Sequence, residues 1–144
     1  MNPEIWGPPA WTFLHSVTLA YPDNPSEIDK ENYKTFFKSL QPVLPCHKCS
    51  MNYLNHINED PVENHLDTKQ SLVKWFIDIH NKVNNSNGKR DYTYDEVMNH
   101  YKFLYNGNFS KDYKQKDSQT SILIWIFVGL VIGLLLFGLK KYLR

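Results

Sequence analysis

Apolar residues recur at spacings of three and four along most of the first hundred positions, which is the period of an amphipathic α-helix. No stretch alternates apolar and polar residues as a half-buried strand would. We therefore predict an all-α protein. A turn at residues 6–11 leads into a first helix that ends near residue 20, and further helices cover about 26–40, 46–58 and 67–86, with a fifth from about 93.

Large apolar side chains mark one face of each longer helix, so these faces are expected to meet in a shared core. The predicted core stripes are Phe13, Leu14 and Val17 in the first helix, Tyr33, Phe36, Phe37 and Leu40 in the second, and Leu72, Trp75, Phe76, Ile79 and Val83 in the fourth. The expected architecture is a four-helix bundle with a short fifth helix.

Two pairs of polar residues have the spacing of helix N-terminal capping boxes. Asp67 with Gln70 is a candidate for the fourth helix, and Thr93 with Glu96 for the fifth. The dipeptide at 87–88 is Asn-Gly, which commonly ends a helix. The fifth helix is expected to turn Tyr94, Val97, Met98 and Tyr101 inward.

Beyond the helices the hydrophobic pattern changes twice. Residues 107–121 are polar and aperiodic and are predicted to be a linker, whereas Ile122–Leu139 is a run of eighteen residues without a charge. As a helix this run would be about 27 Å long, which is just sufficient to cross a bilayer core. The predicted organisation is a helical domain at 1–106, the linker, a transmembrane helix at 122–139 and a basic tail at 140–144.

The orientation of that segment is not determined by charge. Three lysines precede it (Lys111, Lys114, Lys116), and Lys140, Lys141 and Arg144 follow it. The first residues lack the basic and apolar regions of a secretory signal. A short tail crosses a membrane more easily than a folded domain, so residues 1–121 are expected in the cytosol or inside a virion.

Net charge excludes one class of partner. The chain of 144 residues has 16 Lys and Arg against 15 Asp and Glu, and three of the cations lie in the last five residues, which leaves residues 1–121 with a net charge of −2. This is not the pattern of a nucleic-acid-binding protein. The length suits one domain with a modest core.

Both cysteines of the chain lie in Pro45-Cys46-His47-Lys48-Cys49. If Pro45 opens a helix, the two sulfurs lie on one face at i and i+3. A thiol in the first turn of a helix is a better thiolate than a free one, which favours Cys46. A redox-active pair is the preferred interpretation, with a metal site and a plain structural disulfide as alternatives.

Polar side chains also accompany two of the apolar stripes. Trp11 and His15 share one face of the first helix, and His80, Asn81 and Asn84 adjoin the stripe of the fourth, followed by the cations Lys89 and Arg90. Such a set could enclose a ligand that has both a ring and phosphates. The alternative is that these side chains pack within a small helical protein.

Three motifs occur together in this order: Trp6-Gly7-Pro8-x-x-Trp11-x-x-x-His15, Pro45-Cys46-x-x-Cys49, and His80-Asn81-x-Val83-Asn84-x-x-x-Gly88-Lys89. With these motifs the chain resembles the Erv/ALR family of FAD-linked sulfhydryl oxidases, particularly its small viral members. The resemblance implies that Cys46 and Cys49 are catalytic. It also implies that FAD is contacted by Gly7, Trp11, His15, His80, Asn81, Val83, Asn84, Lys89 and Tyr101.

By the same resemblance, a dithiol protein is oxidised by the Cys46–Cys49 disulfide through exchange at Cys46, and the electrons pass through FAD to O2, giving H2O2. A homodimer is usual in the family, and a thioredoxin-like carrier is a natural substrate. Many relatives have a second, shuttle cysteine pair, which is absent here, so substrates must reach Cys46 directly. The rival interpretations are a zinc-binding module and a tail-anchored membrane adaptor without catalysis.

Overall fold

The computed structural model describes residues 1–106, all of whose regular structure is helical. The elements are α1 (Pro3–Leu19), α2 (Glu27–Val43), α3 (His47–Glu59), the short 3-10 helix η1 (Val62–His65), α4 (Lys69–Ser86) and α5 (Tyr94–Asn106). The all-α prediction is thereby confirmed for this part of the chain. The predicted linker, transmembrane helix and basic tail at 107–144 lie outside it. No helix within 1–106 has the length and apolarity to cross a membrane.

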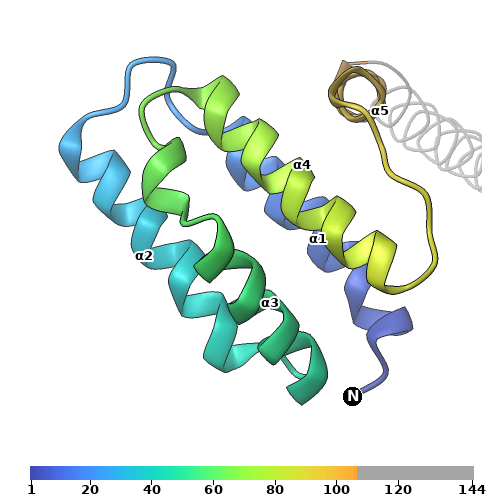
Figure 1. Cartoon of the computed structure of the whole chain (residues 1–144). Coiled ribbons are helices and arrows are strands. Elements are labelled where there is room, and N and C mark those ends of the chain that lie inside the picture. The colour runs from blue at the N-terminus through green and yellow to red at the C-terminus, as the bar shows by residue number, and fades with distance from the viewer. Residues whose placement is uncertain (107–144) are drawn as a thin grey trace, which may run out of the picture. The chain divides into compact units, whose positions relative to one another are not determined.

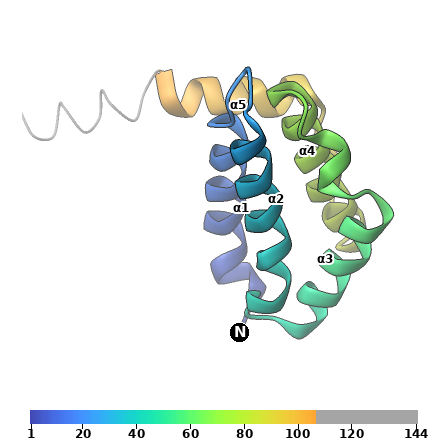
Figure 2. The same cartoon turned by 90° about the vertical axis from the view of Figure 1, so that its left-hand side faces the viewer.

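The four long helices of the first compact unit, Met1–Val97, form two contacting pairs. α1 lies along α4, α2 lies along α3, and α3 also contacts α4, as Figures 1 and 2 show. The second unit begins at Met98, so that α5 starts in one unit and ends in the other.

Half of the core of the first unit is aromatic, and half of it comes from the predicted stripes of α2 and α4, while the loop after α1, helix α3 and the region of η1 supply the rest. Phe37, Leu72 and Phe76 have no solvent exposure, and Trp75 and Ile79 have almost none. Leu14, Val17, Tyr33, Phe36 and Leu40 pack around them. Burying five side chains of this size contributes roughly 1.5–3 kcal/mol each before conformational entropy is subtracted.

α1 differs from the sequence prediction in where it begins and in the burial of Phe13. It begins at Pro3 and so runs through residues 6–11, where a turn was expected, and Asn2 caps it by accepting the Glu4 N–H at 3.0 Å. Pro8 and Pro9 lie inside the helix and remove two donors, but the affected turn is exposed, so water can hydrate the freed carbonyls. Phe13 was predicted to be buried and is 60% exposed.

The start of α4 is also corrected. Thr68, rather than Asp67, is its N-cap, and the Thr68 hydroxyl accepts the Ser71 N–H at 3.1 Å. The Asp67 carboxylate instead pairs with Lys30 of α2 at 3.0 Å. The Thr93 capping box is confirmed, since Thr93 and Glu96 exchange hydrogen bonds of 2.8 and 3.2 Å.

Candidate active site

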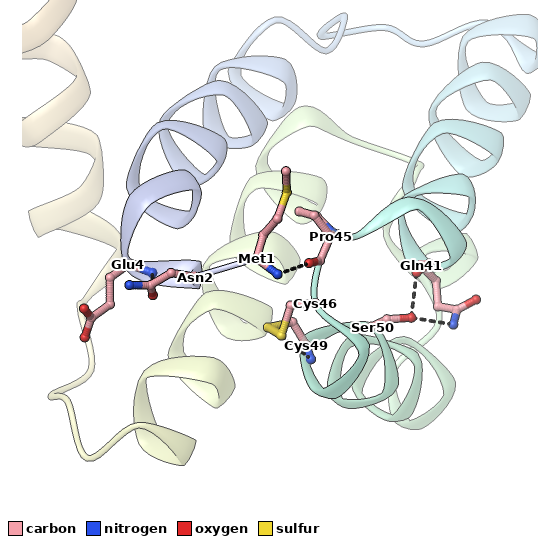
Figure 3. Close-up of a disulfide and its surroundings, with 8 residues drawn as sticks. All are labelled: Met1, Asn2, Glu4, Gln41, Pro45, Cys46, Cys49 and Ser50. Atoms are coloured by element: carbon pink, nitrogen blue, oxygen red, sulfur yellow. Dashed lines mark hydrogen bonds between the residues drawn. A yellow bond between two sulfur atoms is a disulfide. The ribbon is translucent and has the colours of Figure 1, made fainter.

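The two cysteines lie where the chain turns from α2 into α3 (Figure 3). Cys46 is the N-cap of α3, and its sulfur accepts a hydrogen bond from the Cys49 N–H at 3.2 Å. The two residues form a disulfide with their Cα atoms 5.2 Å apart. The predicted i, i+3 arrangement is therefore present, although the helix proper begins one residue later, at His47.

The environment of Cys46 favours negative charge on its sulfur. The first turn of α3 contains no acidic residue, and it directs unpaired backbone N–H groups toward the cap position. His47 and Lys48 are exposed beside it. When the disulfide is reduced, Cys46 is thus the better placed of the two sulfurs to be a thiolate.

A second cluster joins α1 to α4 and is built from aromatic rings. Trp11 stacks on His80, with ring centroids 3.8 Å apart and planes within 6°. His15 Nε2 lies 2.9 Å from His80 Nδ1, a hydrogen bond between residues 65 positions apart. His15 is 3% exposed and meets the ring of Phe76 edge-on. The structure thus brings together three of the predicted ligand residues.

The charge state of His80 follows from this packing. Burial, with an added contribution from the positive charge of Lys89, lowers the pKa of His80 to about 4. At neutral pH the ring is therefore uncharged. A neutral imidazole has one donor nitrogen and one acceptor nitrogen. In His80, Nδ1 is hydrogen-bonded to His15.

One helical turn beyond His80, the side chain of Asn84 is buried at 6% exposure, and its Nδ2 has no hydrogen-bond partner. An unpaired buried amide destabilises the fold by about 1–3 kcal/mol. Asn84 is followed by a turn in which its carbonyl accepts the Lys89 N–H at 2.9 Å, and Gly88 supplies the positive φ of 67° that this turn requires. A planar ligand with polar edges would satisfy the free amide.

The other predicted contact residues are placed differently. Asn81 exchanges hydrogen bonds of 2.9 and 3.0 Å with the backbone of Tyr92, so its amide holds the segment that follows α4. Val83 is half-buried in α4 and Gly7 is buried in α1. Tyr101 belongs to the second unit, where its ring stacks on Tyr105. Their roles toward a cofactor stay predictions.

Two residues that the sequence did not indicate as ligands have buried ring nitrogens without hydrogen-bond partners. Both nitrogens of His56 and the Nε1 of Trp6 lack hydrogen-bond partners. Burial lowers the pKa of His56, and Lys82 adds to the effect. His56 lies seven residues after Cys49 and hence on the same face of α3, a spacing that could have indicated it. Among residues 1–106 no group of three or more His, Cys, Asp or Glu is arranged to hold a metal ion.

Comparison with known proteins decides the family. A family model described as Erv1/Alr matches residues 8–102, which is most of the part of the chain that the structure describes. The chain belongs to the Erv1/Alr family. The matched range includes all three motifs except the first two residues of the Trp6-Gly7-Pro8 segment.

Individual members of the Erv1/Alr family agree with this assignment. A probable FAD-linked sulfhydryl oxidase of Acanthamoeba polyphaga mimivirus is 52% identical over 99 residues, covering 68% of this chain and 69% of the viral protein. The crystal structure of the yeast Erv1 core has a TM-score of 0.64 and 26% identity, covering 76% of this chain and 87% of that one. The FAD-binding domain of Erv1 from Saccharomyces cerevisiae has a TM-score of 0.62 and 30% identity, over 65% and 87% of the two chains.

Proposed function

We propose that this Erv1/Alr protein is an FAD-dependent sulfhydryl oxidase that forms disulfide bonds in protein substrates. The observation that carries the proposal is a disulfide at the N-terminus of α3, in the same compact unit as the cluster of Trp11, His15, His80 and Asn84. Relatives from a virus and from yeast are named FAD-linked sulfhydryl oxidases.

The residues present fit FAD. The cluster offers a wall of flat rings at Trp11 and His80, a buried amide donor without a partner at Asn84, and a cation at Lys89 for a phosphate. When bound, FAD supplies the acceptor of an electron pair that O2 finally removes as H2O2. The protein's own part is the chemistry at the two sulfurs.

Exchange at Cys46 accounts for substrate oxidation. A substrate thiolate attacks Cys46 Sγ, the Cys46–Cys49 bond breaks, and Cys49 leaves as a thiolate. The second substrate thiol, after losing its proton, attacks the substrate sulfur of this mixed disulfide, which forms the substrate disulfide and releases Cys46. Cys46 then leaves as a thiolate that accepts the Cys49 N–H and lies at the positive end of α3. Two electrons have moved from the substrate to the cysteine pair.

The function predicts a yellow protein. The full chain, purified without added cofactor, is expected to show flavin absorbance and to consume one O2 per dithiol oxidised, since a two-electron couple reduces O2 to H2O2. An absorption spectrum and an oxygen electrode with dithiothreitol as substrate measure both. A folded protein that has no flavin after incubation with FAD and consumes no oxygen would rule out the oxidase and favour the adaptor or metal-module alternatives.

The substrate is a dithiol protein small or flexible enough to reach Cys46 directly, because the chain has no further cysteine to relay electrons. A thioredoxin-like carrier has the required chemistry. We also propose that the chain forms the homodimer that is usual in the family that it resembles. Sedimentation equilibrium of the full chain measures the oligomeric state, and a monomer at all concentrations would contradict the dimer.

We further propose that residues 122–139 anchor the enzyme in a membrane, with the oxidase domain in the cytosol or inside a virion. The support is the uncharged run of eighteen residues and the viral origin of the 52% identical relative. In such a reducing compartment disulfides have to be made catalytically.

Protease accessibility tests this proposal. Protease added to intact, sealed membranes from expressing cells is expected to digest the oxidase domain, because the domain faces the added enzyme. A luminal marker protein controls for leakage. Full protection that is lost only with detergent would place the domain in a lumen, and recovery of the full chain in the soluble fraction would remove the anchor.

A further inference from the structure

Two polar residues that none of the three family motifs contains connect the end of α2 to the first turn of α3. The Ser50 hydroxyl donates to the Gln41 backbone carbonyl at 2.7 Å, and Gln41 Nε2 donates back to Ser50 Oγ at 2.9 Å (Figure 3). Ser50 is only 8% exposed. The Ser50 hydroxyl therefore both donates and accepts a hydrogen bond within the protein, at a position that is nearly inaccessible to water.

The need for this contact arises from the prolines around the turn. The last carbonyls of a helix have no intrahelical donor. The Leu40 carbonyl accepts the Leu44 N–H at 3.1 Å, but Pro45, four residues after Gln41, has no N–H to offer. The Ser50 hydroxyl supplies the donor that Gln41 would otherwise lack.

The same serine also belongs to the cysteine turn. The Ser50 N–H donates to the Cys46 carbonyl at 2.9 Å, and Ser50 directly follows Cys49. Cys46 is thus held from two sides, by its own N-cap bond to the Cys49 N–H and by Ser50, which is fastened to α2. A loss of the α2 contact frees the first turn of α3 to fray, and the N–H groups that face Cys46 lose their alignment.

We propose that Gln41 and Ser50 form a positioning pair that keeps Cys46 at the N-cap of α3 and so maintains the thiolate character on which its reaction depends. The proposal rests on the function proposed above in assigning that reaction. Neither residue contacts a reacting sulfur through its side chain. Their effect is on how well the backbone N–H groups stabilise negative charge at Cys46.

Alkylation of the reduced protein measures this effect without flavin chemistry. The full chain is reduced, treated with iodoacetamide over a range of pH, and cleaved with trypsin. Because Lys48 separates the cysteines, peptides 39–48 and 49–69 report on Cys46 and Cys49 individually. In Ser50→Ala the pH midpoint for Cys46 alkylation is expected to rise by about half a unit, which is roughly a threefold loss of thiolate near neutral pH.

Two further serine variants separate positioning from general stability. Ser50→Thr keeps the hydroxyl and is expected to restore the parent midpoint. Ser39→Ala removes a comparable hydrogen bond, from Ser39 to the Phe36 carbonyl at 2.8 Å on the exposed side of α2, and should leave the midpoint unchanged. If Ser50→Ala does not fold, as judged by circular dichroism, Gln41→Ala decides, and a smaller rise in the same direction is expected.

The outcomes are distinct from those that test the oxidase. A parent-like midpoint in the folded Ser50→Ala variant, or in Gln41→Ala where that variant decides, would overturn the positioning pair even if the protein is a flavin oxidase. An equal rise in Ser39→Ala would also overturn it, because the shift would then reflect any lost helix contact. A parent without flavin or oxygen consumption, with the midpoint shift intact, would refute the oxidase and leave the pair standing.

Discussion

Replacing either Cys46 or Cys49 by serine is expected to reduce dithiol oxidation to the rate of the uncatalysed reaction. The chain has only these two cysteines, so neither variant can form the disulfide that accepts the substrate's electrons. A serine hydroxyl cannot replace the lost sulfur in thiol–disulfide exchange. Oxygen consumption with dithiothreitol measures the loss, and flavin absorbance with helical circular dichroism confirms that each variant is folded and loaded.

The two variants are expected to differ in colour. If Cys49 is the inner sulfur, Cys46→Ser retains a thiolate close to the flavin and shows a long-wavelength absorption band, whereas Cys49→Ser loses that band. The N-cap position of Cys46 is consistent with an outer role, because it lies where the chain enters α3 and neighbours the exposed His47 and Lys48. A band that is present only in Cys49→Ser would reverse the two assignments, and unchanged turnover in either variant would refute the exchange mechanism.

Helix positions could be predicted because each apolar stripe obeys a local rule. Phe37, Leu72 and Phe76 are buried where the 3.6-residue period places them. Phe13 lies at a position with the same local pattern and is exposed, because α1 is covered by α4 on its other face. Sequence period identifies an apolar position, but only the neighbouring helix determines whether that position is covered.

Helix ends were harder to predict, because two neighbouring residues often offer equivalent caps. Asp67 and Thr68 both have the right side chain, and the deciding factor is Lys30, which is 37 positions away in sequence and binds Asp67. The helical turn before Pro8 was not predicted either. Prolines argue against a helix interior, but they are tolerated in α1 where the deprived carbonyls face water.

Within the site, the sequence indicated the residue types but not their mutual geometry. Trp11 and His15 on the first helix and His80 on the fourth were predicted as ligands, and the structure adds that His15 and His80 are hydrogen-bonded and that Trp11 stacks on His80. The contact between Gln41 and Ser50 has no recognisable sequence motif, because a hydrogen bond from a serine hydroxyl to a backbone carbonyl requires no characteristic spacing. Such contacts follow from the fold and become visible only with it.

The second large effect is expected at Asn84, where substitution by alanine should weaken FAD binding by about tenfold or more. Its buried Nδ2 has no partner within the protein, so the bond that it makes to a bound ligand is not compensated when the amide is removed. The fold should survive, because Leu72, Phe76 and Ile79 provide the packing of α4. Flavin retained after dialysis of the full chain, and FAD titration of the apoprotein, measure the change.

Asn85→Ala is the matched control for that experiment, because Asn85 is the next residue of α4, is exposed and has no side-chain hydrogen bond in the structure. It should retain flavin like the parent, whereas His80→Ala, which removes both the stacking on Trp11 and the bond to His15, should lose flavin as Asn84→Ala does. If Asn84→Ala instead keeps its flavin and melts at a higher temperature, the unpaired amide was only a defect of packing. The FAD site would then have to be sought away from this turn of α4.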